Sequence, residues 1–157
     1  MIAKIINTII LFLPSYVANS TPVVLGGGPA LDGGEMWSDG KPILGPNKTI
    51  RGGITGIISG TLLGFLQGNL IGGFAQATGA ILGDLLSSFY KRRRDYLPGS
   101  SMPLIDQLDF IIIAVILSYP FQATDLASAF IIMVITIPIH YGTNYVAWLL
   151  KLKKNPW

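Results

Sequence analysis

Three aspartates lie inside or at the edge of segments that are otherwise apolar. Asp84 follows a charge-free run of 32 residues, and Asp106 and Asp109 open a second apolar segment. Residues three apart share one face of a helix, so the carboxylates of Asp106 and Asp109 should point the same way. An ionisable group inside a membrane-spanning helix is costly and indicates a functional site. Carboxylate oxygens suit a hard cation such as Mg2+, which also takes phosphate oxygens as ligands.

Four basic residues, 91–94 (KRRR), directly follow the segment that holds Asp84. Beside three carboxylates, they indicate an anionic ligand that binds together with the cation. The alternative is a buried ion pair of Asp84 with Arg92 or Arg93. The other two aspartates would then only stabilise the positively polarised N-terminus of their helix. The residues alone leave both interpretations open.

A glycine-rich segment, 45–53 (GPNKTIRGG), precedes another apolar stretch. Glycines let a backbone approach phosphates, and the start of a helix offers free N–H groups to an anion. Lys48 would add a point charge, and Arg51 a planar fork of donors. The spacing is not that of a Walker motif. The alternative is a flexible loop whose basic side chains extend toward the membrane surface.

His140 and Asn144 lie one helical turn apart in the last apolar segment. They are either hydrogen-bonded core residues or part of a polar pocket. Gly56, Gly60 and Gly64 are spaced by four. This spacing allows close helix packing, and it could also shape a groove between helices. Packing alone is the preferred interpretation.

The elements that position these residues follow from composition. Of 157 residues, 50% are hydrophobic and 12% charged, and the mean hydropathy is +0.56. A soluble domain carries about 25% charged residues, so we predict a single-domain, all-α integral membrane protein. The absence of cysteine excludes a disulfide scaffold, a thiolate metal site and a cysteine nucleophile. Because a spanning helix needs about 20 apolar residues, we expect five transmembrane helices, near residues 2–20, 52–68, 71–90, 104–120 and 125–150.

Two boundaries need a choice. The second and third spans meet at Gln67-Gly68-Asn69, which favours a hairpin over one long helix. The first span is long and belongs with the charge topology, so a retained helix is favoured over a cleaved signal peptide. Ser100 or Ser101 is expected to cap the fourth helix.

Charge asymmetry predicts the orientation. Ten of the eleven basic residues lie in loops 21–51 and 91–103, at the edges of these loops, or in the C-terminal tail. Five spans place these segments on one face, which should be the cytoplasm. The N-terminus would be outside and the C-terminus inside. Seven of the eight acidic residues share that face, and a passive anchor would not need them. We therefore expect a multi-pass protein of the cell membrane with its active site facing the cytoplasm.

The motifs resemble a known enzyme group. Segment 88–92 (SFYKR), followed at a distance by 106–109 (DQLD), resembles the signature of the CDP-diacylglycerol synthases. This chain is shorter than those enzymes and lacks the Lys-Asp and His-Gly-Gly elements of their spacer. It is more similar to their archaeal counterparts, the CDP-archaeol synthase family. The matching pieces are 48–52 (KTIRG), 83–84 with 88–89 and 91–93, 106–109, His140 with Asn144, and Pro156-Trp157.

The resemblance implies transfer of a cytidylyl group from CTP to the phosphate of 2,3-bis-O-geranylgeranylglycerol 1-phosphate, with release of pyrophosphate. It implies Mg2+ as cofactor, and CTP, an isoprenoid ether-lipid phosphate and the bilayer as partners. The implied catalytic and metal-binding residues are Asp84, Asp106 and Asp109. The implied nucleotide-binding residues are Lys48, Thr49, Arg51, Gly52, Lys91, Arg92 and Arg93. Further pocket residues would be Asp32, Ser88, His140 and Asn144.

Two other functions were weighed. A CDP-alcohol phosphotransferase would need an Asp-Gly-x-x-Ala-Arg core, but Asp32-Gly33 continues as Gly34-Glu35-Met36. A small ion-coupled transporter with intramembrane acids is the alternative from another class. Transporters usually show repeats and midplane sites, whereas these acids lie at one interface. No nucleic-acid partner is expected, and an oligomer is possible.

Overall fold

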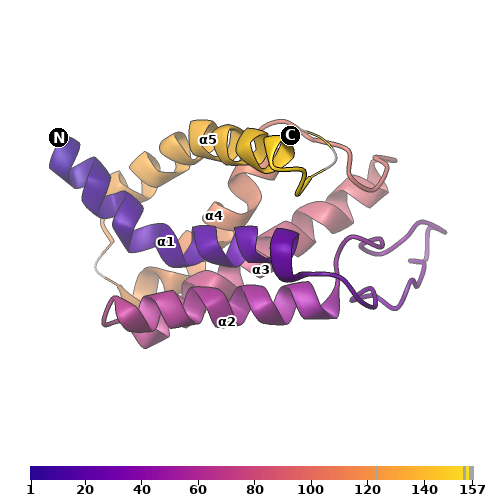
Figure 1. Cartoon of the computed structure of the whole chain (residues 1–157), viewed down its shortest axis with the longest axis horizontal. Coiled ribbons are helices and arrows are strands. Elements are labelled where there is room, and N and C mark those ends of the chain that lie inside the picture. The colour runs from indigo at the N-terminus through magenta and orange to yellow at the C-terminus, as the bar shows by residue number, and fades with distance from the viewer. Residues whose placement is uncertain (123, 154, 156–157) are drawn as a thin grey trace.

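The chain folds into a bundle of helices (Figure 1). The computed structural model describes residues 1–122, 124–153 and 155. In these residues, the structure outside the helices includes two isolated β-bridges but no strand. The all-α prediction is therefore confirmed. The elements are α1 (Ile2–Leu25), α2 (Ile50–Leu66), α3 (Leu70–Arg93), α4 (Ile105–Ser118), the 3-10 helix η1 (Tyr119–Phe121) and α5 (Leu126–Leu149).

Three of these helices are long and apolar enough to cross a membrane. They are α1, α3 and α5, each of 24 residues, and α2 is a shorter apolar helix of 17 residues. Only 17% of the most apolar window of α5 is buried inside the molecule. Its remaining apolar surface needs a nonaqueous environment, since soluble monomers rarely expose large apolar patches. The chain is a multi-pass membrane protein.

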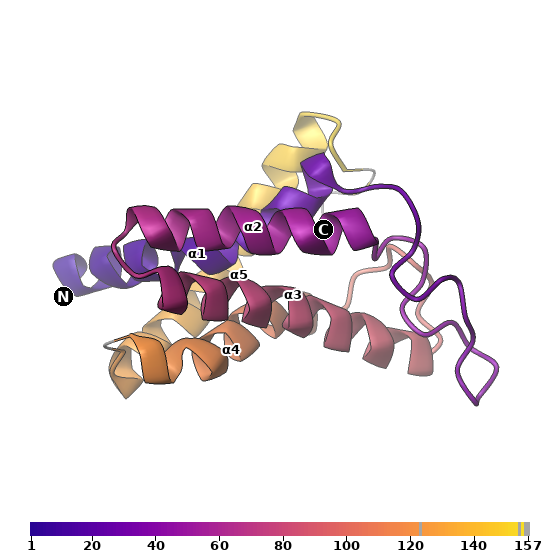
Figure 2. The same ribbon diagram turned by 90° about the horizontal axis from the view of Figure 1, so that it is seen from below.

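The hairpin predicted at Gln67-Gly68-Asn69 is confirmed. Gln67 ends α2, Gly68 adopts a left-handed φ of 79°, and Asn69 caps α3 by accepting the Gly72 N–H at 2.8 Å. Helices α2 and α3 run side by side as a result (Figure 2).

Other boundaries differ from the prediction. Helix α1 continues through Pro22 to Leu25, so the first loop spans 26–49 rather than 21–51. Helix α3 continues to Arg93, which shortens the second loop to 94–104. The predicted serine cap of α4 is wrong. Leu104, with φ 67°, precedes the helix without a side-chain cap.

Small residues allow the helices to approach closely. Gly56, Gly60 and Gly64 are all buried along α2. A Cβ on Gly60 would lie 2.6 Å from the Pro14 carbonyl oxygen of α1, and one on Gly56 would lie 2.7 Å from that of Ala18. Both positions therefore exclude any side chain. The preferred interpretation of these glycines as packing residues is confirmed.

Helix α1 is bent (Figure 1), and Pro14 and Pro22 lie inside it. Pro14 has no N–H to donate to the carbonyl four residues earlier, that of Ile10. The Gln67 amide donates to this carbonyl at 2.7 Å. Gln76, only 2% exposed, donates to the Leu11 carbonyl at 2.8 Å and accepts the Ser15 N–H at 3.3 Å. Side chains from the α2–α3 hairpin thus satisfy the backbone of α1 at its bend.

Lys4 and Asp125 are the two charges that lie apart from the charged clusters. They form an ion pair at the opposite end of the bundle, with Nζ 2.7 Å from Oδ2. Asp125 also caps α5 by accepting the Ser128 N–H. The hydrogen bonds from Lys4 and Ser128 hold the pKa of Asp125 below its ordinary value.

Candidate active site

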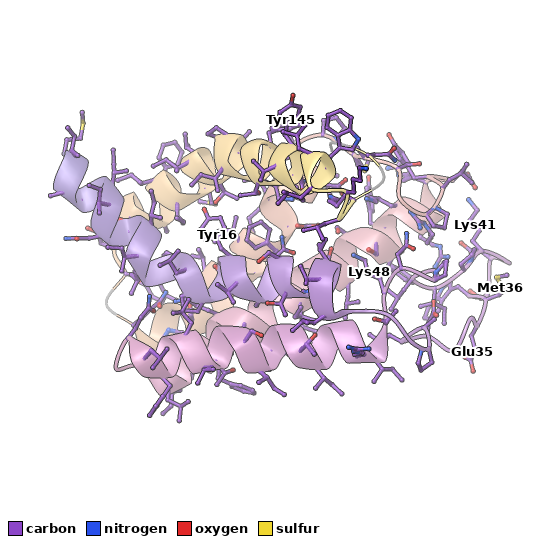
Figure 3. All side chains as sticks on the ribbon, viewed as in Figure 1. Tyr16, Glu35, Met36, Lys41, Lys48 and Tyr145 are labelled. Atoms are coloured by element: carbon purple, nitrogen blue, oxygen red, sulfur yellow. The ribbon has the colours of Figure 1, made fainter. Side chains whose placement is uncertain are left out.

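The charged segments meet at one end of the bundle, where the first loop folds against the C-terminal end of α3. Lys41 of the loop pairs with Asp95 at 2.6 Å, and Asp39 pairs with Arg93 at 2.8 Å. Figure 3 shows Lys41 and Lys48 at this end. Residues more than 50 positions apart in the sequence are therefore neighbours here.

Two lysine–aspartate pairs form the centre of this end. Lys48 Nζ lies 2.6 Å from both carboxylate oxygens of Asp84. Lys91 Nζ lies 2.8 Å from Asp106 Oδ1, and Asp106 also accepts the Met102 N–H at 2.8 Å. The alternative pairing of Asp84 with Arg92 or Arg93 is wrong, because Asp84 forms its ion pair with Lys48 instead. Both pairs are partly buried, so water screens them less than it screens fully exposed surface pairs.

Asp109 lies beside the two pairs, within electrostatic range of Asp84 and Asp106. Ser87 of α3 donates a hydrogen bond to its carboxylate. Gly83 makes this approach possible, since a Cβ there would lie 2.8 Å from the Phe110 Cα. Helices α3 and α4 thus bring the three aspartates together.

Sequence reasoning missed Ser87. The signal was present, because positions 84, 87 and 91 share one face of a helix. Ser88, the neighbouring residue that the resemblance implies for the pocket, is also buried in α3 at 5% exposure.

His140 and Asn144 approach the same cluster from α5. The Asn144 amide nitrogen lies 3.1 Å from His140 Nδ1. His140 is within electrostatic range of Asp106 and Asp84. His140 and Asn144 are therefore hydrogen-bonded to each other, as expected for the first of the two alternatives, and they also lie next to the charged cluster. Asn144 accepts a 2.9 Å hydrogen bond from Lys153 of the tail.

Arg92 and Arg93 are engaged elsewhere. Arg92 is only 5% exposed and donates to the Leu97 carbonyl at 3.2 Å. Arg93 donates to the Pro42 carbonyl, and its guanidinium lies 4.6 Å from the centre of the Phe89 ring. These contacts tie the two loops to α3, and they give neither arginine a contact with the aspartate trio.

Residues of the glycine-rich segment also cap α2 and allow it to pack against α1. Thr49 caps α2, with Oγ1 accepting the Gly52 N–H at 3.1 Å. Gly52 is buried, and a Cβ there would lie 3.2 Å from Pro22 Cβ of α1. Arg51 is exposed in the first turn of α2. Lys48 is therefore the residue of this segment that contacts the aspartates.

Asp32 organises the first loop from within. One carboxylate oxygen accepts the Leu44 N–H at 2.8 Å and the Gly45 N–H at 3.0 Å. The other oxygen accepts the Gly34 N–H at 3.0 Å. Burial alone would raise the pKa of Asp32, but these backbone donors outweigh it and hold the pKa below its ordinary value. The contacts found for Asp32 are those of a structural residue.

The described residues also line an open pocket of about 410 Å³ at the opposite end of the bundle. Its lining includes Gln67, Asn69 and Gln76, whose amides already bind backbone carbonyls. None of its described lining residues is charged, so it lacks the groups needed to bind a phosphate substrate.

The aspartate trio can be tested for its fit to a metal ion. Within the described parts of the chain, no group of three Asp, Glu, His or Cys side chains is placed so that it could hold a metal ion by itself. Mg2+ does not require such a group, because it is usually held by one or two carboxylates together with substrate phosphates and waters. The carboxylate oxygens of Asp84, Asp106 and Asp109 are the kind of donor that Mg2+ prefers, and in this structure those of Asp84 and Asp106 are paired with Lys48 and Lys91.

Apolar helices that gather acids and lysines at one end define a membrane-embedded enzyme. The whole chain, residues 1–157, matches the family model of CarS-like CDP-archaeol synthases. The chain therefore belongs to the CDP-archaeol synthase family.

Individual relatives agree with this assignment. A CDP-archaeol synthase of Pyrococcus furiosus is 40% identical over 156 residues, which cover 92% of this chain and 93% of the relative. One of Methanococcus aeolicus is 35% identical, with 100% and 99% coverage. A solved structure of an intramembrane enzyme for archaeal membrane lipids biosynthesis has a TM-score of 0.77 and 36% identity, covering 89% of this chain and 94% of that one.

The prediction of a nucleotidyltransferase is thereby confirmed, since the family's reaction is CTP-dependent cytidylyl transfer in archaeal lipid synthesis. The family assignment favours this function over the ion-coupled transporter. Lys154 of the tail and the matching pair Pro156-Trp157 lie outside the described residues.

Proposed function

We propose that this protein forms unsaturated CDP-archaeol and pyrophosphate from CTP and 2,3-bis-O-geranylgeranylglycerol 1-phosphate, with Mg2+ as cofactor. The observation that carries the proposal is the joint cluster of Asp84, Asp106 and Asp109 with Lys48 and Lys91 at one end of apolar helices. A soluble nucleotide and a lipid headgroup can meet only near the membrane surface.

The reaction needs no protein nucleophile. A phosphate oxygen of the lipid attacks the α-phosphorus of CTP, a new P–O bond forms, and the bond to pyrophosphate breaks. The residues of the chain must hold the two phosphates in line and neutralise charge that builds on their oxygens. Mg2+, held by the three aspartates, would supply Lewis-acid stabilisation of these oxygens.

Lys48 and Lys91 suit the phosphates of CTP. Both ammonium groups are positioned by carboxylates that are themselves the proposed metal ligands. A substrate that brings both phosphate and metal can therefore exchange with both ion pairs at once. We assign Thr49, Gly52, Arg92 and Arg93 to shaping the nucleotide site, in keeping with their contacts to the loops. Arg51, exposed beside Lys48 in sequence, is a further nucleotide ligand in this proposal.

A lysine substitution tests the nucleotide site. Lys91→Met should raise the Michaelis constant for CTP by about tenfold or more, because a charge-assisted hydrogen bond contributes roughly 1.5–3 kcal/mol. Steady-state cytidylyl transfer in detergent measures it. Lys41→Met is the matched control, since Lys41 also pairs with an aspartate at this end but lies outside the trio. Equal CTP constants in both variants and the unaltered protein would refute this assignment of Lys91.

We also propose that all five helices cross the membrane, with the N-terminus outside and the site facing the cytoplasm. The charge distribution supports this orientation, because nine of the ten basic residues that the structure describes lie in the two loops, or at the helix ends beside them, at one end of the bundle. The opposite end carries the Lys4–Asp125 pair, whose charges cancel. Helix α4 has only 14 residues, but η1 extends it.

Reporter fusions test the orientation. A reporter placed after the C-terminus should be cytoplasmic, and one inserted at Asn69 should be external, since an odd number of spans separates them. Enzymatic reporters active on only one side of the membrane give the readout. An external C-terminus would contradict the orientation and the cytoplasmic site together.

A further inference from the structure

The chain reverses direction directly after α5. Lys151 adopts a left-handed φ of 58°. The N–H groups of Leu152 and Lys153 then donate to the Ala147 carbonyl at 2.9 and 3.3 Å. A left-handed residue with return hydrogen bonds is a common way to end a helix, but glycine usually holds that position. The turn fixes where Lys153 lies.

This turn directs the Lys153 side chain back toward the charged cluster. Its Nζ donates to Asn144 Oδ1 at 2.9 Å, and the Asn144 amide in turn contacts the His140 ring. The ammonium is within electrostatic range of both lysine–aspartate pairs. Three lysines thus reach the cluster from three parts of the chain: Lys48 from the first loop, Lys91 from α3 and Lys153 from the tail.

Lys153 differs from its neighbour in the tail. Lys151 is exposed, as a lysine that only sets topology should be, whereas Lys153 is partly buried. Burial lowers the pKa of Lys153, Lys48 and Lys91 act in the same direction, and Asp106 and Asp84 oppose them. Withdrawing an ammonium from water is costly, and membrane orientation alone does not require it.

We infer that Lys153 binds a phosphate group of one of the two substrates, so that the turn at residues 151–153 forms one wall of the active site. Asn144 positions the ammonium, and His140 orients Asn144. The phosphate belongs either to CTP or to the lipid acceptor, and the same ammonium chemistry serves both. Helix α5, which carries Asn144, is the long apolar helix with the smallest buried share, 17%, so the tail lies beside a face open to lipid.

The inference rests on the proposed function, and one set of assays tests both. Michaelis constants for CTP and for the lipid phosphate are measured separately for the unaltered protein, Lys153→Met, Lys153→Gln and Lys153→Arg. Lys151→Met is the matched control. The methionine and glutamine variants should raise one Michaelis constant about tenfold or more, and arginine should retain most of the affinity. A rise for CTP assigns Lys153 to the triphosphate, and a rise for the lipid assigns it to the acceptor.

Two other outcomes are separable. If the unaltered protein turns over CTP and both Michaelis constants in the methionine or glutamine variant stay within about twofold of its values, Lys153 is a structural residue and the inference is overturned. A lower turnover number with unchanged Michaelis constants also overturns the inference, because an effect confined to turnover is not a loss of substrate binding. If the unaltered, monodisperse protein transfers no cytidylyl group at all, the proposed function fails. Having glutamine as well as methionine keeps the test valid if one variant folds poorly.

Discussion

Asparagine at position 84, 106 or 109 should lower magnesium-dependent cytidylyl transfer by on the order of a hundred- to a thousandfold, the effect of removing one preorganised transition-state contact. Asparagine retains the shape and one carbonyl oxygen but loses the charge that holds a divalent cation. Because Lys48 and Lys91 can still donate to the amide oxygen at positions 84 and 106, these variants should fold. Turnover of CTP with lipid phosphate in detergent is the measurement.

Asp95→Asn is the matched control for this experiment. Asp95 belongs to the same charged end and pairs with Lys41, but its side chain is 78% exposed and lies outside the trio. Its left-handed φ of 63° suits asparagine. The control should keep nearly full activity. If the trio variants lose thermal stability while the surviving protein turns over normally, the aspartates are structural ion-pair residues and not metal ligands.

Gly83→Ala should reduce turnover by about a hundredfold, the scale expected when reacting groups are misplaced by about 1 Å. The added methyl would lie 2.8 Å from the Phe110 Cα and against the Asp109 carbonyl, which are backbone atoms that cannot rotate away. Helices α3 and α4 must separate, and Asp84 moves away from Asp109. Overpacking of this kind also costs about 1–3 kcal/mol of unfolding free energy.

Gly142→Ala provides the comparison. Gly142 is also a helical glycine, but a Cβ there meets no atom within 4 Å. Alanine is the better helix former by about 0.5–1 kcal/mol, so this variant should be as stable as the unaltered protein or more stable, with unchanged turnover. Thermal unfolding and activity are measured on both. Equal behaviour of the two variants would show that close contact at Gly83 does not position the aspartates.

The sequence predicted the helices well where one local signal decides. Charge-free runs placed all five helices, and Gly68 with its polar neighbours placed the hairpin. An aspartate in an apolar helix is costly whatever its partners are, so the sequence alone identified Asp84, Asp106 and Asp109 as candidate site residues. The family signature then joined these residues to one reaction.

Partners set by distant parts of the chain could not be predicted. Lys48 reaches Asp84 only because the first loop folds back over the end of α3, held by contacts such as Lys41–Asp95. The prediction of a serine cap for α4 was wrong for a related reason. The path of the second loop places Leu104, and not a serine, at the start of the helix. In the sequence, Lys153 is only one of several basic residues after the last helix, because nothing local marks the turn at Lys151.

The amide bonds at the bend of α1 bear on how the protein is made. Gln67 and Gln76 lie 57 and 65 residues after the carbonyls of Ile10 and Leu11 that they bind. During synthesis, the first helix therefore forms before its partners exist, and the carbonyls of Ile10 and Leu11 have neither amide donor until the α2–α3 hairpin is made. This favours docking of the α2–α3 hairpin as soon as it emerges. Proline in α1 thus couples the insertion of the first helix to that of the third, and makes assembly of the N-terminal half an ordered event.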